Sequence, residues 1–260
     1  MAGLVYAILY SIGAVGVFAQ AINLKVIVNT LQSNEVLSAF LFSFYIAIMA
    51  IAISLLVVLP NVITFHQQVT QHKNAFVLYL PLAIPAIVAA FISFQLFGKT
   101  GLLSAIAFKL GIINNLQQFP DWVNDTWGIG IIATHALMAI PFFTIYFSNL
   151  FVAENLQSLG HVAHTLGATP RQVTYKIYYP NLIKKGAATI LLYFVFVLGS
   201  YEIPLLLGQQ QPQMITVLIV KKLQRFNIAD MPQGYCIAVL YCILIMLVMG
   251  VFFKLKKQTS

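Results

Sequence analysis

Long uncharged apolar runs constrain this chain more than any other feature. Residues 1–24 contain no Lys, Arg, Asp or Glu, and further apolar runs follow along the sequence; about twenty apolar residues are enough for a helix to cross a bilayer. The mean hydropathy of the 260 residues is +0.90, which excludes an ordinary globular protein. Backbone groups in lipid must be satisfied internally, and the runs do not alternate as barrel strands would. We therefore expect an all-α polytopic membrane protein.

The runs predict a single transmembrane domain, residues 1–260, with six membrane-spanning helices. Pro60 is expected to end the second helix, because proline removes a donor and clashes with the preceding turn. Pro81 and Pro85 are expected to kink the third helix. Residues 214–220 are apolar but too few to cross, so they are expected to form a short or re-entrant helix. The six predicted spans are residues 2–22, 36–58, 76–97, 128–152, 187–207 and 235–253.

A polar, basic segment, residues 154–186, separates the fourth span from the fifth. Its first part, Glu154 to Leu166, has the pattern of an amphipathic helix. Gly167 follows, and glycine readily takes the left-handed conformation that closes a helix at its C′ position. We expect a helix that ends at this glycine.

A second helix is expected directly after the first. Thr169 can act as its N-cap, Pro170 suits its first helical position, and Gln172 can complete a capping box. Pro180 disfavours helix in the residue before it. The second helix is therefore predicted to stop near Tyr179.

The spacing in this segment resembles the cytoplasmic EAA loop of permease subunits of bacterial type I ABC importers, of the polyamine, iron and phosphonate type. The resemblance rests on Leu166-Gly167-Ala168, then Ile177, then Pro180 thirteen residues after the glycine, with His161-Val162-Ala163 in place of the family's Glu-Ala-Ala. In that family the loop docks into the ATPase subunit and transmits its closure to the pore. The resemblance implies these ATPase-coupling residues: His161, Val162, Ala163, Leu166, Gly167, Ala168, Thr169, Pro170, Ile177 and Pro180.

Two further stretches resemble the same family. Residues 97–103, Phe-Gly-Lys-Thr-Gly-Leu-Leu, are similar to a turn that follows the third span in these permeases, and residues 226–234 are similar to a stretch before their last span. The Gly-Lys-Thr within the first stretch is not a phosphate loop, because Ser93 stands where that motif needs its first glycine.

The resemblance also implies the partners and the location of the chain. Such a subunit lies in the bacterial inner membrane and pairs with a homologous or identical permease, two ATPase subunits and an external solute-binding protein. ATP and Mg²⁺ belong to the ATPase, and no cofactor is expected on this chain. The implied solutes are a polyamine or another small cation, iron, or a phosphonate.

The net charge of +8 is carried by short loops between spans, which is typical of orientation signals rather than of a nucleic-acid surface. With the polar loop inside and six spans, both termini are expected in the cytoplasm.

Ser200, Tyr201 and Glu202 interrupt the fifth apolar run, and Glu202 is the only acidic residue in a predicted span. A charged carboxylate at mid-membrane costs at least about 2.5 kcal/mol. Two interpretations remain open: these three residues lie on the substrate pathway, where Glu202 meets a cation, or Glu202 is solvated at the interface beside Pro204.

The sequence offers no catalytic residue and no metal site. His135, in the fourth span, is either a pathway residue or a packing histidine. His161 and His164 are three residues apart, but zinc would need further ligands, so exposed loop histidines are favoured. An intramembrane hydrolase would need a nucleophile or a metal cluster in the spans. An ion-coupled secondary transporter remains the alternative function, although it usually has charges near mid-membrane and an internal repeat, and the sequence has neither.

Overall fold

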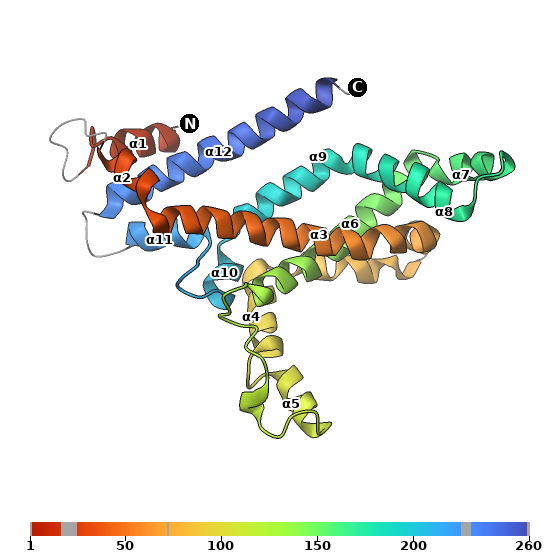
Figure 1. The fold of residues 1–260 in the computed structure, drawn as a ribbon, viewed down its shortest axis with the longest axis horizontal. Helices are drawn as coiled ribbons and strands as arrows, with labels where there is room; N and C mark the ends of the chain where they lie inside the picture. Colours follow the sequence, from red (N-terminus) through yellow and green to blue (C-terminus); the bar gives the residue numbers. More distant parts are fainter. Residues whose placement is uncertain (1, 17–24, 72, 225–229, 259–260) are drawn as a thin grey trace. The chain divides into compact units, whose positions relative to one another are not determined.

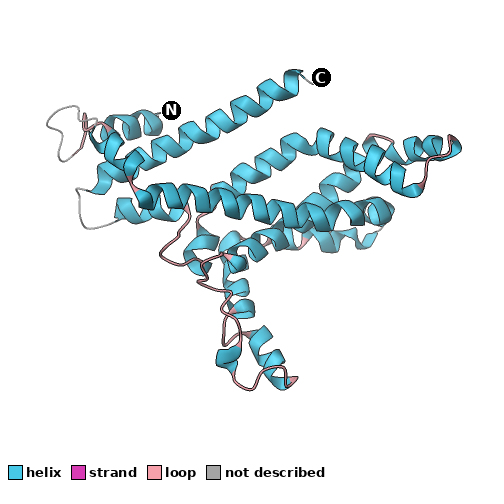
Figure 2. Cartoon of the chain, viewed as in Figure 1, coloured by secondary structure: helices cyan, strands magenta, loops and turns pink. Residues whose placement is uncertain are grey.

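The structure, a computed structural model, describes residues 2–16, 25–71, 73–224 and 230–258. Over these residues the regular structure is helical and contains no strand (Figure 2), which confirms the all-α fold class. The chain divides into two compact units: unit 1 comprises Met1–Tyr45 and Leu198–Ser260, and unit 2 comprises Ile46–Val197. Five described helical stretches are long and apolar enough to cross a membrane: Asn34–Thr70, Ala86–Lys109, Ile129–Ala153, Pro170–Leu198 and Met231–Lys254.

Unit 2 is built around helix α6 (Ile129–Ala153), which corresponds closely to the predicted fourth span. Phe143, Phe147 and Phe151 recur every four residues and so lie on one face of this helix. All three are buried, and they form a core with apolar residues of helix α3 (Asn34–Gln71) and helix α9 (Tyr179–Leu198). The other members of this core are Val58, Leu59, Val62, Ala139, Leu156 and Leu182.

Helix α3 continues through Pro60, so the prediction that the second span ends there was wrong. Proline removes one backbone hydrogen bond from a helix interior. Polar side chains next to it bond to carbonyls of the same helix: Asn61 Nδ2 donates to Val57 O at 2.7 Å, and Thr64 Oγ1 donates to Pro60 O at 3.2 Å. Neither bond reaches Leu56 O, the carbonyl that loses its donor because Pro60 has no N–H.

The predicted third span is broken rather than kinked. Two 3₁₀ segments, η1 (Lys73–Tyr79) and η2 (Pro81–Ala83), precede helix α4 (Ala86–Phe97), and Pro85 is the N-cap of that helix. Proline pre-sets the backbone angle of a helix start and disfavours helix in the residue before it. The two prolines therefore begin new elements instead of bending one helix.

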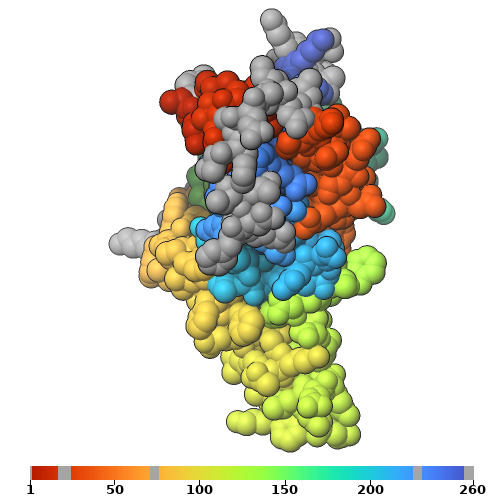
Figure 3. All heavy atoms as spheres, turned by 90° about the vertical axis from the view of Figure 1, so that its left-hand side faces the viewer, coloured from red at the N-terminus to blue at the C-terminus, as the bar shows by residue number. Residues whose placement is uncertain are grey.

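Helix α4 leads into a projecting part of unit 2 (Figure 1). It is followed by helix α5 (Leu102–Lys109) and a short 3₁₀ segment, η3 (Leu116–Gln118). In the space-filling view the yellow and yellow-green side chains of this part pack together (Figure 3). Aromatic edges join it: the rings of Phe97 and Phe119 both contact Trp122, at centroid distances of 6.0 and 5.2 Å.

In unit 1, helix α1 (Ala2–Ser11) packs on helix α12 (Met231–Gln258), with the Tyr10 and Tyr235 rings 4.5 Å apart. The prediction of one continuous span over residues 2–22 was wrong, because α1 ends at Ser11. Gly13 has φ of 75°, its N–H bonds to Tyr10 O, and the next N–H bonds to Leu9 O. This is the Schellman pattern that ends helices at glycine. Residues 17–24 of that span lie outside the described residues.

Helix α11 (Ile215–Gln224) is the short helix predicted for residues 214–220. Two residues of α3 hold its two ends: the Ser43 hydroxyl accepts from Ile215 N, and Lys222 Nζ lies 3.1 Å from Glu35 Oε2. Glu35 and Ser43 are eight residues apart, or about 12 Å along a helix, so α11 runs beside the first turns of α3. Helix α2 (Lys25–Gln32) packs on α12 in the same unit.

Helix α12 starts at Met231, with Pro232 at its second position. This start lies four residues before residue 235, where the sixth span was expected to begin. Residues 226–229 of the family-like stretch lie outside the described residues.

Candidate functional site

The first helix of the polar loop is α7 (Leu156–Thr165), and its end is the one that the sequence predicts. Gly167 has φ of +89°. Its N–H bonds to His164 O at 3.0 Å, and the N–H of Ala168 bonds to Ala163 O at 2.9 Å. These two bonds are the Schellman motif, with glycine at C′. The prediction for Gly167 is confirmed.

The second helix, α8 (Pro170–Val173), begins with the predicted capping box. Gln172 N donates to Thr169 Oγ1 at 3.4 Å, and Thr169 N donates to Gln172 Oε1 at 2.9 Å. Each side chain satisfies a backbone donor that the helix start leaves free. Only two residues, Gly167 and Ala168, separate the closed end of α7 from the capped start of α8, so their relative direction is tightly defined.

The prediction that the second helix stops near Tyr179 was wrong. After α8 the chain forms a π-helical segment, η4 (Thr174–Tyr178), and continues directly into α9, with Pro180 as the second residue of α9. The N–H of Tyr179 bonds to Thr174 O, five residues back. A π-turn is wider than an α-turn, so it gives the proline ring room where an α-turn would bring it against a carbonyl.

An ion pair joins the two ends of the loop. Lys185 Nζ, in α9, lies 3.2 Å from Oε2 of Glu154, the C-cap residue of α6. Both side chains are partly exposed, so solvent screens the pair, and its contribution is at most about 1 kcal/mol. Elsewhere the loop is basic, and the Arg171 guanidinium lies 5.8 Å from the centre of the Tyr175 ring, within the range of a cation–π contact.

An apolar stripe runs along the exposed side of α7. It consists of Leu159, Val162 and Leu166, whose exposed fractions are 48%, 57% and 82%. Positions i, i+3 and i+7 share one face of a helix. Three such side chains on a short helix of a polar loop form an unsatisfied apolar surface, which is typical of a binding site for another protein.

The remaining residues of the predicted coupling set have varied positions. His161 is exposed, Ala163, Ala168 and Ile177 are half-buried, and Pro180 is exposed. His164 is also exposed, and its Nδ1 lies 2.9 Å from Ala168 O, across the end of the helix. In the part of the chain that the structure describes, no group of three His, Cys, Asp or Glu residues could hold a metal ion.

The predicted fifth span is two helices rather than one. Helix α9 ends at Leu198, and helix α10 (Glu202–Leu207) begins after a break that contains Ser200 and Tyr201. The Ser200 carbonyl accepts from Thr216 Oγ1 of α11 at 2.5 Å, which compensates part of the lost helix bonding. Ser200 is buried and Glu202 is exposed. The break thus falls on the polar triplet that interrupts the apolar run.

His135 lies on the inner side of α6 and is fully buried. Neither ring nitrogen has a hydrogen-bond partner within the described residues. Its role, in packing or on a pathway, stays a prediction.

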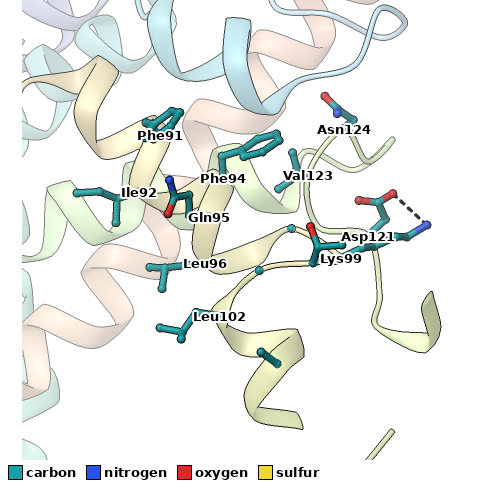
Figure 4. A pocket seen from close by; sticks show the side chains of 14 residues that line it. Phe91, Ile92, Phe94, Gln95, Leu96, Lys99, Leu102, Asp121, Val123 and Asn124 are labelled. Atoms are coloured by element: carbon teal, nitrogen blue, oxygen red, sulfur yellow. Dashed lines mark ion pairs between the residues drawn. The ribbon is translucent and has the colours of Figure 1, made fainter. Parts of the chain in front are cut away.

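A pocket of about 710 Å³ lies in the projecting part of unit 2 and contains none of the predicted site residues. Residues 98–102 of the family-like turn form one wall. Lys99 Nζ lies 3.2 Å from Asp121 Oδ2 at its rim, and Phe94, Gln95 and Val123 line the interior (Figure 4). Gly101 is required for this turn, because an added Cβ would overlap the Gln95 carbonyl oxygen.

Sequence reasoning missed two residues of the loop: Gly160, which is buried on α7, and Tyr178, which is half-buried at the end of η4. Tyr178 lies against the buried Phe151 ring, with centroids 5.1 Å apart. A glycine inside a helical pattern is a local signal, but no local pattern marks its contact with Tyr178, which joins positions eighteen residues apart.

The family model described as "Binding-protein-dependent transport system inner membrane component" matches residues 74–257, which is most of the chain and includes the whole polar loop. No curated protein is similar enough to the chain to count as a relative.

Proposed function

Because the chain belongs to the family of inner-membrane components of binding-protein-dependent transport systems, we propose that it is the subunit that forms the solute pathway of an ATP-driven importer. In this proposal ATP is bound and hydrolysed by a separate subunit. That subunit docks on residues 154–186, and the solute is delivered by an external binding protein to a pathway shared with a second permease subunit.

The observation that supports ATPase docking most directly is the apolar stripe of α7. Leu166 is 82% exposed, and exposing a leucine to water costs about 1.5–3 kcal/mol relative to burying it. A Schellman motif and a capping box fix the backbone around it. A pre-organised apolar face of this kind binds a partner with little loss of conformational entropy.

For the solute, we propose that the pathway passes the break at Ser200, Tyr201 and Glu202. Non-helical backbone at membrane depth is tolerated where it lines a cavity or is buried in protein, and broken helices are frequent at transport sites. The exposed carboxylate of Glu202 favours a cationic solute such as a polyamine. In the proposed orientation the loop and both termini are cytoplasmic.

Leu166→Asp tests the docking proposal. The side chain is almost fully exposed, so the variant should insert and fold normally, while a charge on the stripe should weaken binding of the ATPase subunit on the order of tenfold or more. Gln157→Asp is the matched control, since it adds the same charge to an exposed position of α7 on the side opposite the stripe. The measurement is co-purification of the ATPase with each variant. Equal recovery with both variants would exclude the stripe as the docking surface.

A further inference from the structure

Gly160 and Tyr178 make a close contact between the two halves of the loop. An added Cβ at Gly160 would overlap the Tyr178 hydroxyl and would lie 2.7 Å from its Cζ and 3.1 Å from its Cε1. Any side chain at this position must therefore displace the ring or the helix. The approach of α7 to η4 depends on glycine.

The Tyr178 ring has little freedom to withdraw from this contact. It meets the Phe151 ring edge-on, with centroids 5.1 Å apart and an interplanar angle of 66°. Phe151 is only 2% exposed and packs in turn on the His66 ring of α3, with centroids 4.3 Å apart. A continuous series of aromatic contacts thus runs from α3 through α6 to the residue that faces Gly160.

Two features connect this contact to the apolar stripe. Gly160 is buried on the side of α7 turned away from Leu159, Val162 and Leu166, as the helical repeat of 3.6 residues requires. Tyr178 is the last residue of the π-helical segment η4, and π-segments frequently occur at functional sites because they re-aim side chains. The contact and the stripe therefore lie on opposite sides of α7.

We propose that Gly160 and Tyr178 form a positioning pair that sets the angle at which α7 presents its apolar stripe. The pair acts through the geometry of the helix and does not itself touch the partner. Phe151 and His66 hold the tyrosine ring and so tie this angle to helices α3 and α6. The inference rests on the proposed function in that the partner at the stripe is taken to be the ATPase subunit.

Gly160→Ala is the primary test. Alanine is the better helix former, so a loss of coupling would come from the contact and not from a weaker helix. The control is Gly250→Ala in α12, where an added Cβ meets no atom within 4 Å. The rescue variant is Gly160→Ala with Tyr178→Leu, in which a smaller side chain makes room for the methyl group.

Two measurements test the positioning pair and the proposed function separately. Spin labels introduced by Gln157→Cys and Lys176→Cys, both exposed positions, report the distance between α7 and η4 in the permease alone, with both native cysteines replaced by alanine. MgATP hydrolysis by the complex with its ATPase subunits, in phosphatidylethanolamine–phosphatidylglycerol vesicles, reports coupling.

In Gly160→Ala the label distance should shift or broaden, and MgATP hydrolysis should fall on the order of tenfold. The rescue variant should recover both, and Gly250→Ala should change neither. An unchanged label distance in Gly160→Ala would overturn the inference, as would a changed distance with full hydrolysis. If the wild-type permease bound no ATPase subunit at all, the proposed function would fail instead, whatever the labels report.

Discussion

The Ser43 hydroxyl accepts a hydrogen bond from the Ile215 N–H over 2.8 Å, and both residues are buried. The N–H groups at the start of a helix have no partner within that helix, and in an apolar environment such a group must find one elsewhere. A serine of α3 thus satisfies the first donor of α11. The same hydroxyl donates to Ala39 O of its own helix at 2.8 Å.

Ser43→Ala should lower the free energy of unfolding by about 1–3 kcal/mol, because it leaves a buried donor unsatisfied. Ser54→Ala is the matched control: Ser54 is equally buried on α3, but its hydroxyl only donates to Ala50 O one turn back. Thermal unfolding of the detergent-solubilised protein should show a clearly lower midpoint for Ser43→Ala alone. Equal midpoints would mean that the bond to α11 contributes nothing.

Lys222→Met should destabilise the protein by roughly 1–3 kcal/mol, because it leaves the Glu35 carboxylate without its partner. The Lys222 side chain is 8% exposed and that of Glu35 is 26% exposed, so water offsets part of the larger cost typical of fully buried pairs. The double variant Glu35→Gln with Lys222→Met should recover much of the loss. Thermal midpoints of both variants, with Lys221→Met as the control, check this expectation; a double variant as unstable as the single would contradict it.

Gly167→Val should impair docking of the ATPase subunit without impairing membrane insertion. The residue has φ of +89°, and an added Cβ would meet no atom within 4 Å, so the penalty is backbone strain rather than a clash. That strain is on the order of 1–2 kcal/mol for an ordinary side chain, and it should loosen the junction of α7 and α8. We expect normal insertion with reduced co-purification of the ATPase subunit.

Gly167→Asn is the control for this strain, because asparagine tolerates the left-handed conformation at C′. It should retain the ATPase. Loss of binding in both variants would indicate that the side chain, and not the backbone angle, is responsible.

Glu202→Gln should lower the uptake of radiolabelled spermidine into vesicles that hold the assembled importer, if Glu202 meets a cationic solute, and should leave basal MgATP hydrolysis unchanged. The carboxylate is exposed at the start of α10 and its loss should not affect folding. Asp121→Asn, which removes an exposed carboxylate outside both the loop and the break, is the control for uptake. Equal spermidine uptake by wild type and Glu202→Gln would remove this residue from the pathway.

Cysteine labelling tests the proposed orientation. In a background without Cys236 and Cys242, Thr169→Cys should react with a membrane-impermeant maleimide only after the cells are opened, whereas Gln210→Cys should react in intact cells. Both positions are exposed. Reaction of Thr169→Cys in intact cells would invert the topology.

The helix end and the helix cap in the loop could be predicted from the sequence, while the effect of the prolines on helix ends could not. Gly167 and the Thr169–Gln172 pair depend on neighbours within three residues, and the structure confirms both. Pro60 and Pro180 were expected to end helices, but α3 continues through the first and a π-turn precedes the second within a continuous helical stretch. No residue pattern in the sequence predicts these adjustments of the backbone.

The contacts that were missed join distant parts of the chain. Gly160 with Tyr178, and Ser43 with Ile215, are separated by 18 and 172 residues. Hydrophobic periodicity marks which side of a helix is buried, but not which partner it meets. A glycine in a helix is a recognisable anomaly, and Gly160 is a signal that could have pointed to the contact between α7 and η4.

From Pro170 to Leu198 the chain is helical without interruption, over 29 residues. At the rise of an α-helix this is a rod about 43 Å long. One end carries the capped turn of the loop, and the other ends at the Ser200–Glu202 break. A rod of this length acts as a lever: pivoting it by about 5° at the loop moves its far end by about 4 Å. If an ATPase subunit docks on the loop, as proposed, small rotations there would become displacements large enough to open or close a passage for a small solute.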